Sequence, residues 1–199
     1  MRRSLCFRVM LIRKSSCRER ILRCNMCRRT AEEWRTDMLF GRKKETKNTR
    51  GKLFATQDGD CIPLEQVPDP VFSEKMLGDG IAVIPADNIV KSPADGTVVQ
   101  VFDTLHAYSV RTDDGLEILV HIGLNTVELK GEGFTAKVKS GDSVKAGDVL
   151  CETDLNFLRE KGYETYTPII ITNMDAVKDF KPITGNVRAG QTAVIEYEI

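Results

Sequence analysis

Histidine is almost absent from this sequence, with only two among 199 residues. This scarcity excludes zinc peptidases built on β-sandwiches, which need an His-x-His pair and a further histidine and aspartate. The sequence also contains no H-E-x-x-H or G-x-S-x-G motif, so it indicates neither of those hydrolase types. No run of eighteen apolar residues occurs, which predicts no membrane-spanning helix and no direct membrane insertion.

Cysteine is scarce after residue 37, where only Cys61 and Cys151 occur. Both have apolar neighbours, so we expect small buried thiols and no disulfide framework, as in a reducing, cytoplasmic setting. The first 37 residues hold the other four cysteines, and Cys24 and Cys27 form a C-x-x-C motif. Its spacing to the two earlier cysteines matches no standard zinc finger.

Charge is divided unevenly along the chain, although the formal net charge is zero. Residues 1–50 contain sixteen Lys/Arg against five Asp/Glu, whereas residues 51–199 contain thirteen against twenty-four. The resulting charges of +11 and −11 indicate that the two parts are not one folding unit. The acidic part argues against nucleic-acid binding and suits a basic protein partner.

Residues 1–37 have no clean periodicity and no apolar core of a signal peptide. Codons for Glu32–Arg35 can contain GGAGG, a ribosome-binding sequence, shortly before the codon of Met38. We therefore expect residues 1–37 to be a start-site artefact or a disordered basic extension. Residues 38–58 are expected to form a flexible basic leader, and residues 59–199 the folded domain.

The folded part is dense with short apolar segments separated by Gly, Asp and Pro. We expect short helical turns after the caps Asp69, Asp154 and Asn173. The pattern predicts an all-β fold, an antiparallel β-sandwich or barrel-like structure with a few short helical turns. The expected strands include 96–102, 107–112, 116–122, 134–139 and 192–199.

Both histidines lie in these apolar segments. In LEILVHI (116–122), Leu119 and His121 share one face of the strand, and Ile122 lies on the other. A lone histidine on a strand is usually structural, but a turn at 113–115 would bring His106 beside His121. Thr104 lies two residues before His106 and so offers its hydroxyl on the same face.

This arrangement suits phosphoryl chemistry better than metal binding. No third ligand lies at metal-binding spacing, so we expect no intrinsic metal and no required cofactor. An imidazole is largely a free base near neutral pH and can form a phosphohistidine. His106 and Thr104 could supply hydrogen bonds to the phosphoryl oxygens.

One internal similarity favours a different carrier. Residues 90–102 and 138–152 resemble the two halves of biotinyl and lipoyl carrier domains. Such domains attach their cofactor to a lysine, typically within Met-Lys-Met, and that tripeptide is absent here.

Four stretches together resemble a known family: VPDPVFSEKMLGDGIAV (67–83), SPADGTVVQVFDTLHAYSV (92–110), LEILVHIGLNTVELKGEGF (116–134) and TPIIITNMD (167–175). They are similar to the glucose-type enzyme IIA of the bacterial phosphoenolpyruvate-dependent sugar phosphotransferase system. The resemblance implies that residues 59–199 form an antiparallel β-sandwich that acts as a phosphotransferase component. His121 would accept a phosphoryl group from the phosphocarrier protein HPr and pass it to a cysteine on the IIB domain of a glucose-type sugar permease. His106 would assist onward transfer, and Thr104 would hydrogen-bond His106.

The resemblance also implies a surface that binds both partners. Its apolar centre would comprise Val71, Phe72, Phe102, Leu119, Ile122 and Val127. Its acidic rim would comprise Asp69, Glu74, Glu128 and Asp175. Asn125 stands where many family members have an aspartate, which removes one carboxylate from the rim. An apolar centre with an acidic rim suits a weak, fast encounter with basic partners.

A regulatory function is the alternative. In some bacteria the dephosphorylated protein of this family inhibits other transporters or kinases. Zinc shared by the two histidines and a carboxylate of the partner sometimes joins the two proteins. His106 and His121 permit this function.

Overall fold

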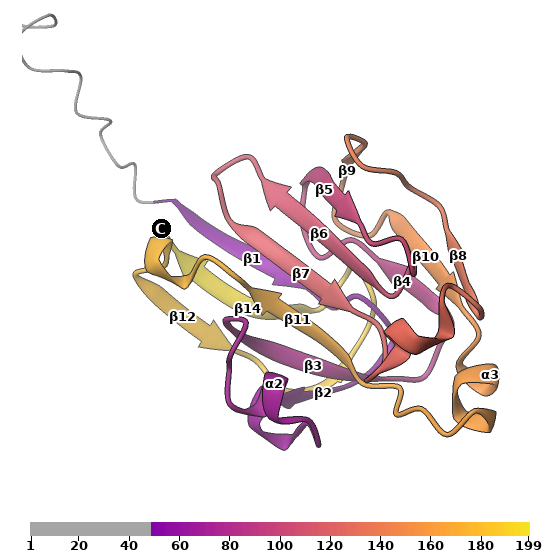
Figure 1. The fold of residues 1–199 in the computed structure, drawn as a ribbon. Coiled ribbons are helices and arrows are strands. Elements are labelled where there is room, and N and C mark those ends of the chain that lie inside the picture. The colour runs from indigo at the N-terminus through magenta and orange to yellow at the C-terminus, as the bar shows by residue number, and fades with distance from the viewer. Residues whose placement is uncertain (1–48) are drawn as a thin grey trace, which may run out of the picture. The chain divides into compact units, whose positions relative to one another are not determined.

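The computed structural model describes residues 49–199, which form three antiparallel sheets (Figure 1). The large sheet contains, in order, β13 (Gly185–Val187), β2 (Gly59–Pro63), β3 (Asp79–Pro85), β11 (Thr167–Ile171), β7 (Glu117–His121), β6 (Ala107–Thr112), β5 (Gly96–Val101) and β9 (Ser143–Val144). One small sheet contains β1 (Arg50–Phe54), β14 (Ala193–Glu198) and β12 (Asp179–Pro182). The other contains β4 (Ile89–Lys91), β10 (Val149–Thr153) and β8 (Phe134–Ala136). The predicted all-β antiparallel fold is confirmed.

The helices are short, as the sequence predicts. They are α2 (Pro70–Ser73), α3 (Leu155–Glu160) and the 3₁₀ turns η3 (Leu64–Gln66), η4 (Thr126–Leu129) and η5 (Met174–Ala176). Asp69 caps α2 by accepting a hydrogen bond from the Val71 amide, and Asp154 caps α3 through the Phe157 amide. These two caps are confirmed.

The third expected turn forms with Asn173 at its N-cap position, but the expected side-chain cap is absent. The Asn173 amide group instead donates to the Gly115 carbonyl at 2.9 Å and accepts from the Glu117 amide at 2.8 Å. Asn173 therefore ties η5 to the β6–β7 turn.

Side chains from all three sheets form the main core. Leu53 of β1, Val90 of β4, Ile118 of β7 and Ile195 of β14 are fully buried within one cluster. The strand alternation predicted from the sequence therefore places one face of each sheet inward.

A second, smaller cluster lies on the opposite face of the large sheet. It contains Leu64, Val67, Phe72, Ala82, Leu124 and Ile170. All five residues of β11 are buried, because Ile169 and Ile171 face the main core while Ile170 faces this second cluster. The cluster holds α2 and η3 against the sheet, and the two histidines lie beside it.

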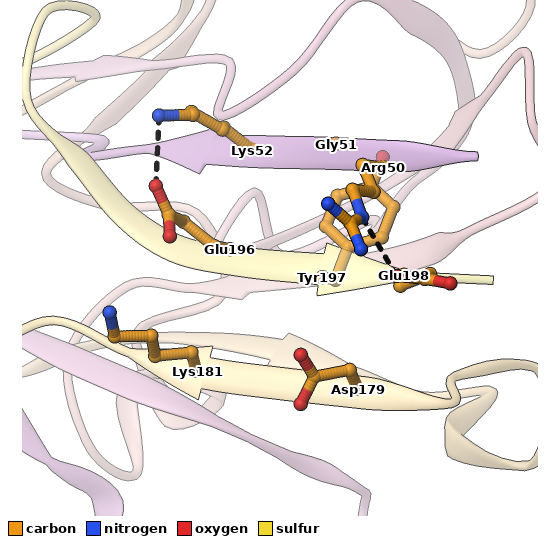
Figure 2. A pocket seen from close by; sticks show the side chains of 8 residues that line it. All are labelled: Arg50, Gly51, Lys52, Asp179, Lys181, Glu196, Tyr197 and Glu198. Atoms are coloured by element: carbon orange, nitrogen blue, oxygen red, sulfur yellow. Dashed lines mark hydrogen bonds and ion pairs between the residues drawn. The ribbon is translucent and has the colours of Figure 1, made fainter. Parts of the chain in front are cut away.

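Strand β1 corrects the expected leader. Residues 50–54 pair with β14 instead of forming part of a flexible segment. Figure 2 shows two ion pairs between these strands, Arg50–Glu198 and Lys52–Glu196, each at 2.8 Å. The reason for the pairing is that Leu53 is buried in the main core, which a basic composition alone did not reveal. The predictions for residues 1–37 and 38–48 lie outside the described residues.

Among residues 49–199, no helix is long and apolar enough to cross a membrane.

Candidate phosphoryl-transfer site

The two histidines meet at adjacent ends of β6 and β7. Ala107 pairs with His121 across the two strands, and the Ile122 amide donates to the His106 carbonyl at 2.7 Å. The ring centroids lie 4.9 Å apart with planes inclined at 78°. The structure therefore brings together the two imidazoles that the hairpin argument predicted as neighbours.

A tight turn before β6 positions His106. The Leu105 amide donates to the Phe102 carbonyl at 2.7 Å, and Leu105 has a φ of 55°. This left-handed conformation is uncommon for a leucine, but the side chain packs against the main core, which holds it in place. Thr104 Oγ1 then lies 2.6 Å from His106 Nδ1, which places the hydroxyl where the sequence predicts it.

The contacts of His121 distinguish its two ring nitrogens. Nδ1 lies 2.8 Å from the carbonyl oxygen of Gly123. A carbonyl oxygen can only accept, so Nδ1 carries the proton and donates this hydrogen bond. In the neutral ring Nε2 therefore bears the free lone pair.

Both rings favour the neutral form. Burial, and to a lesser extent the positive charge that His106 can carry, lower the pKa of His121 to about 4. The Gly123 carbonyl and the charge of Asp69 oppose these effects. Burial also lowers the pKa of His106. Nε2 of His121 is therefore unprotonated, and available as a nucleophile, near neutral pH.

An aromatic ring flanks each histidine. Phe72 meets His121 edge-on with centroids 5.1 Å apart, and Phe102 meets His106 at 5.7 Å. Phe72 is only 4% exposed and belongs to the second cluster. The prediction that Phe72 belongs to the exposed partner-binding surface is thus wrong. Phe72 is buried, where it supports α2 and packs beside His121.

Ile122 is a second correction to the apolar centre. It is fully buried in the main core. The cause is the alternation of β7, since successive side chains point to opposite faces and His121 takes the outer one. Leu119 shares the face of His121, is partly buried, and packs against the second cluster.

Two residues of the predicted apolar centre are exposed, one on α2 and one on η4. Val71 is 39% exposed and Val127 is 50% exposed. Two further apolar residues that follow α2 are also exposed, Met76 at 68% and Leu77 at 42%. The Met76 amide donates to the Val71 carbonyl at 3.2 Å, so this chain segment folds back on α2. Because α2 ends at Ser73 and not at Met76, these apolar residues leave the helix and face solvent.

The residues predicted for the acidic rim differ in exposure. Glu74 and Glu128 are exposed, and the Tyr163 hydroxyl donates to Glu128 at 3.4 Å. Asp69 is half-buried, and one of its carboxylate oxygens accepts from the Val71 amide at 2.8 Å. Asn125 is exposed and has a left-handed φ of 58°, which asparagine tolerates well.

Asp175 lies toward the end of β7 opposite His121. It lies in η5, which Asn173 ties to the β6–β7 turn at Gly115 and Glu117. Glu117 begins β7 and His121 ends it, so about 13 Å of extended strand separates the two ends. The antiparallel pairing of β11 with β7 carries the chain toward the Glu117 end of β7. Asp175 is exposed there, and its place in the acidic rim stays a prediction.

The pocket drawn in Figure 2 lies on the sheet of β1, β14 and β12 and is lined by charged side chains of that sheet. Residues 49–199 contain no cluster of three or more His, Cys, Asp or Glu that could hold a metal ion. Cys61 and Cys151 are buried and free.

Comparisons with known proteins identify a family. Residues 51–177 match the model described as phosphoenolpyruvate-dependent sugar phosphotransferase system, EIIA 1. The match begins inside β1, in accord with the ordered strand. A glucose-specific EIIA component from Halalkalibacterium halodurans is 43% identical over 167 residues, covering 81% of this chain and 96% of the relative.

Two further relatives extend the comparison. A glucose-specific EIICBA component from Streptococcus pneumoniae is 46% identical over 153 residues, covering 77% of this chain and 21% of that longer protein. The solved structure of glucose permease IIA from Mycoplasma capricolum is 40% identical, with a TM-score of 0.70, covering 75% of this chain and 96% of that one.

Proposed function

Because the chain belongs to the EIIA 1 family of the phosphoenolpyruvate-dependent sugar phosphotransferase system, we propose that it carries a phosphoryl group on Nε2 of His121. The donor is phosphorylated HPr, and the acceptor is a cysteine of the IIB domain of a glucose-type permease. One observation carries this assignment: Nδ1 of His121 is engaged by the Gly123 carbonyl, so the lone pair of Nε2 is free beside His106.

The transfer step conserves atoms and electrons. The lone pair of His121 Nε2 attacks the phosphorus atom of the phosphohistidine on HPr. As the new N–P bond forms, the N–P bond of the donor breaks, and its electron pair returns to the donor nitrogen. The proton on His121 Nδ1 stays in place, and the Gly123 carbonyl stabilises the positive charge that develops on the ring.

His106 acts on the phosphoryl oxygens. The Thr104 hydroxyl, 2.6 Å from His106 Nδ1, donates to that nitrogen and keeps the ring proton on Nε2. The Nε2–H group then donates to a phosphoryl oxygen on His121. This hydrogen bond matters most when the group leaves for the cysteine of IIB, because negative charge spreads over the oxygens in that step.

The exposed apolar side chains and the acidic rim support the docking of both partners in turn. Val71 and Val127 are the exposed members of the apolar centre, and Glu74 and Glu128 are exposed members of the acidic rim. The Streptococcus pneumoniae relative, named an EIICBA component, supports a permease of the glucose family as the acceptor. The two free, buried cysteines support a reducing, cytoplasmic location.

A phosphotransfer assay tests the proposal. Purified protein is mixed with phosphoenolpyruvate, enzyme I, HPr and the IIB domain of a candidate permease. We expect His121→Ala to accept no phosphoryl group, and His106→Gln to accept it but to pass it on at a greatly reduced rate. The product should be acid-labile and base-stable, as a phosphohistidine is. Phosphate on His106, or phosphorylation that survives in His121→Ala, contradicts the assignment.

The closeness of the two imidazoles also supports a regulatory function of the dephosphorylated protein. His106 and His121 could share a zinc ion with a carboxylate from a bound transporter or kinase, which would supply the missing ligand. Pull-downs with unphosphorylated protein, with and without zinc, test this function. Binding that is equal in both conditions, or that persists in His106→Gln, rules out the zinc bridge.

A further inference from the structure

Two successive peptide planes after His121 are each held at both ends. In the first plane, the Ile122 carbonyl accepts from Thr126 Oγ1 at 2.5 Å, and the Gly123 amide donates to the Tyr166 carbonyl at 2.9 Å. In the second plane, the Gly123 carbonyl accepts from His121 Nδ1, and the Leu124 amide donates to the Glu164 carbonyl at 2.9 Å. The Gly123 carbonyl, which sets the tautomer of His121, thus belongs to a segment whose peptide groups are hydrogen-bonded on both sides.

Thr126 is the side chain that holds the first plane. A threonine hydroxyl on the protein surface can bond to water. Thr126 is instead fully buried at the start of η4. Its methyl group also packs against Gly123, because a Cβ added at that glycine would lie 2.5 Å from Thr126 Cγ2. Gly123 has a left-handed φ of 73°, which a glycine adopts without strain.

We propose that Thr126 is a positioning residue for the phosphoryl acceptor: by holding the Ile122–Gly123 peptide, it aims the Gly123 carbonyl at His121 Nδ1 and keeps Nε2 as the nucleophile. The inference rests on the proposed function, since it concerns the nitrogen that takes the phosphoryl group. Without the Thr126 hydroxyl, the buried Ile122 carbonyl loses its partner, and only the Gly123 amide still holds this plane. The two planes meet at the Cα of Gly123, so a shift of the first changes the direction of the Gly123 carbonyl, and the second tautomer of His121 becomes populated.

Thr126→Val tests this inference, because valine keeps the shape of threonine and removes the hydroxyl. Long-range ¹⁵N–¹H NMR spectra of the unphosphorylated protein report the tautomer of His121. We expect wild type and Thr126→Ser to show a proton on Nδ1, and Thr126→Val to show a mixture of both tautomers. The rate of phosphorylation by HPr at saturating HPr should fall about tenfold or more in Thr126→Val and be restored in Thr126→Ser.

Thr153→Val is a matched control. Thr153 is 3% exposed in β10, and its hydroxyl has no hydrogen-bond partner among residues 49–199. The same exchange of hydroxyl for methyl there should leave the tautomer of His121 and the phosphorylation rate unchanged. If Thr126→Val does not fold, Thr126→Ala removes the same hydroxyl without adding bulk and gives the same test.

The outcomes separate this inference from the proposed function. A wild-type protein that HPr does not phosphorylate on His121 contradicts the proposed function, while the NMR spectra still report the tautomer. A Thr126→Val protein that is folded, keeps the Nδ1 proton and is phosphorylated at the wild-type rate overturns the role of Thr126. Loss of the tautomer in Thr126→Ser also overturns it, because that variant retains the hydroxyl.

Discussion

The environment of His121 on balance disfavours a positive charge on its ring. Burial has the largest effect on its pKa, and a charge on His106, 4.9 Å away between ring centroids, adds to it. The residue is still partly exposed, which leaves part of it accessible to a docking protein. At the residue scale, burial keeps the imidazole neutral, as the proposed nucleophile requires.

The lowered pKa predicts that His121 becomes protonated only at acidic pH. An NMR titration should show a midpoint near pH 4, well below the ordinary value of about 6.5. Between these values the unfolded chain binds more protons than the folded protein, so the free energy of unfolding rises with pH. This contribution to stability is complete above about pH 6.5 and is lost as the pH falls through about 4. A midpoint at 6 or above contradicts the burial of the ring.

Strand β1 depends on a close contact between a glycine and an aromatic ring. Gly51 pairs with Tyr197 of β14, and a Cβ added at Gly51 would lie 2.2 Å from the tyrosine ring. The Tyr197 hydroxyl in turn donates to the Asp114 carboxylate at 3.0 Å. The ring therefore cannot shift without disturbing the β6–β7 turn, and only glycine fits at position 51.

We expect Gly51→Ala to lower the free energy of unfolding by about 1–3 kcal/mol, since the added methyl group displaces a packed ring. Urea denaturation of the purified protein measures this change. Lys52→Ala on the same strand is the control, because its ion pair with Glu196 is exposed and its loss should cost less than about 1 kcal/mol. Equal effects of both variants contradict the packing explanation. Phosphorylation of His121 should persist in both.

The net negative charge of residues 51–199 affects how the whole molecule attracts its binding partners. Its net charge of −11 should attract a basic protein over long distances, while the exposed side chains near the histidines set the docked position. Of the four predicted rim carboxylates, Glu74, Glu128 and Asp175 are exposed and Asp69 is half-buried. Asp175 lies at the far end of β7 and provides a natural comparison.

We expect Glu128→Gln to lower kcat/KM for phosphorylation by HPr a fewfold at low salt, with little effect at high salt, because screening removes the attraction. Asp175→Asn removes the same charge far from the histidines and should leave kcat/KM nearly unchanged. Stopped-flow or quenched-flow measurements of kcat/KM at two ionic strengths test this prediction. An equal loss in both variants indicates that net charge alone, and not the rim, governs the encounter.

Much of the site could be predicted from the sequence because it depends on local order. The two-residue period of LEILVHI puts His121 and Leu119 on one face, and a turn at 113–115 returns the chain so that His106 lies beside them. The same period also places Ile122 in the core, and the expectation that it faces a partner ignored this alternation. The caps at Asp69 and Asp154 likewise follow from neighbouring residues alone.

The sequence by itself determined the fold class, the pairing of the two histidines, the hydroxyl of Thr104 and the acidic character of the body. Only the tertiary structure decided which nitrogen of His121 is free, because the Gly123 carbonyl is aimed by contacts with Thr126, Tyr166 and Glu164. It also decided that Phe72 is buried, that Asp175 lies toward the Glu117 end of β7 and that residues 50–54 are a strand. Each of these depends on contacts between segments far apart in the chain, and periodicity and composition describe only neighbours along it.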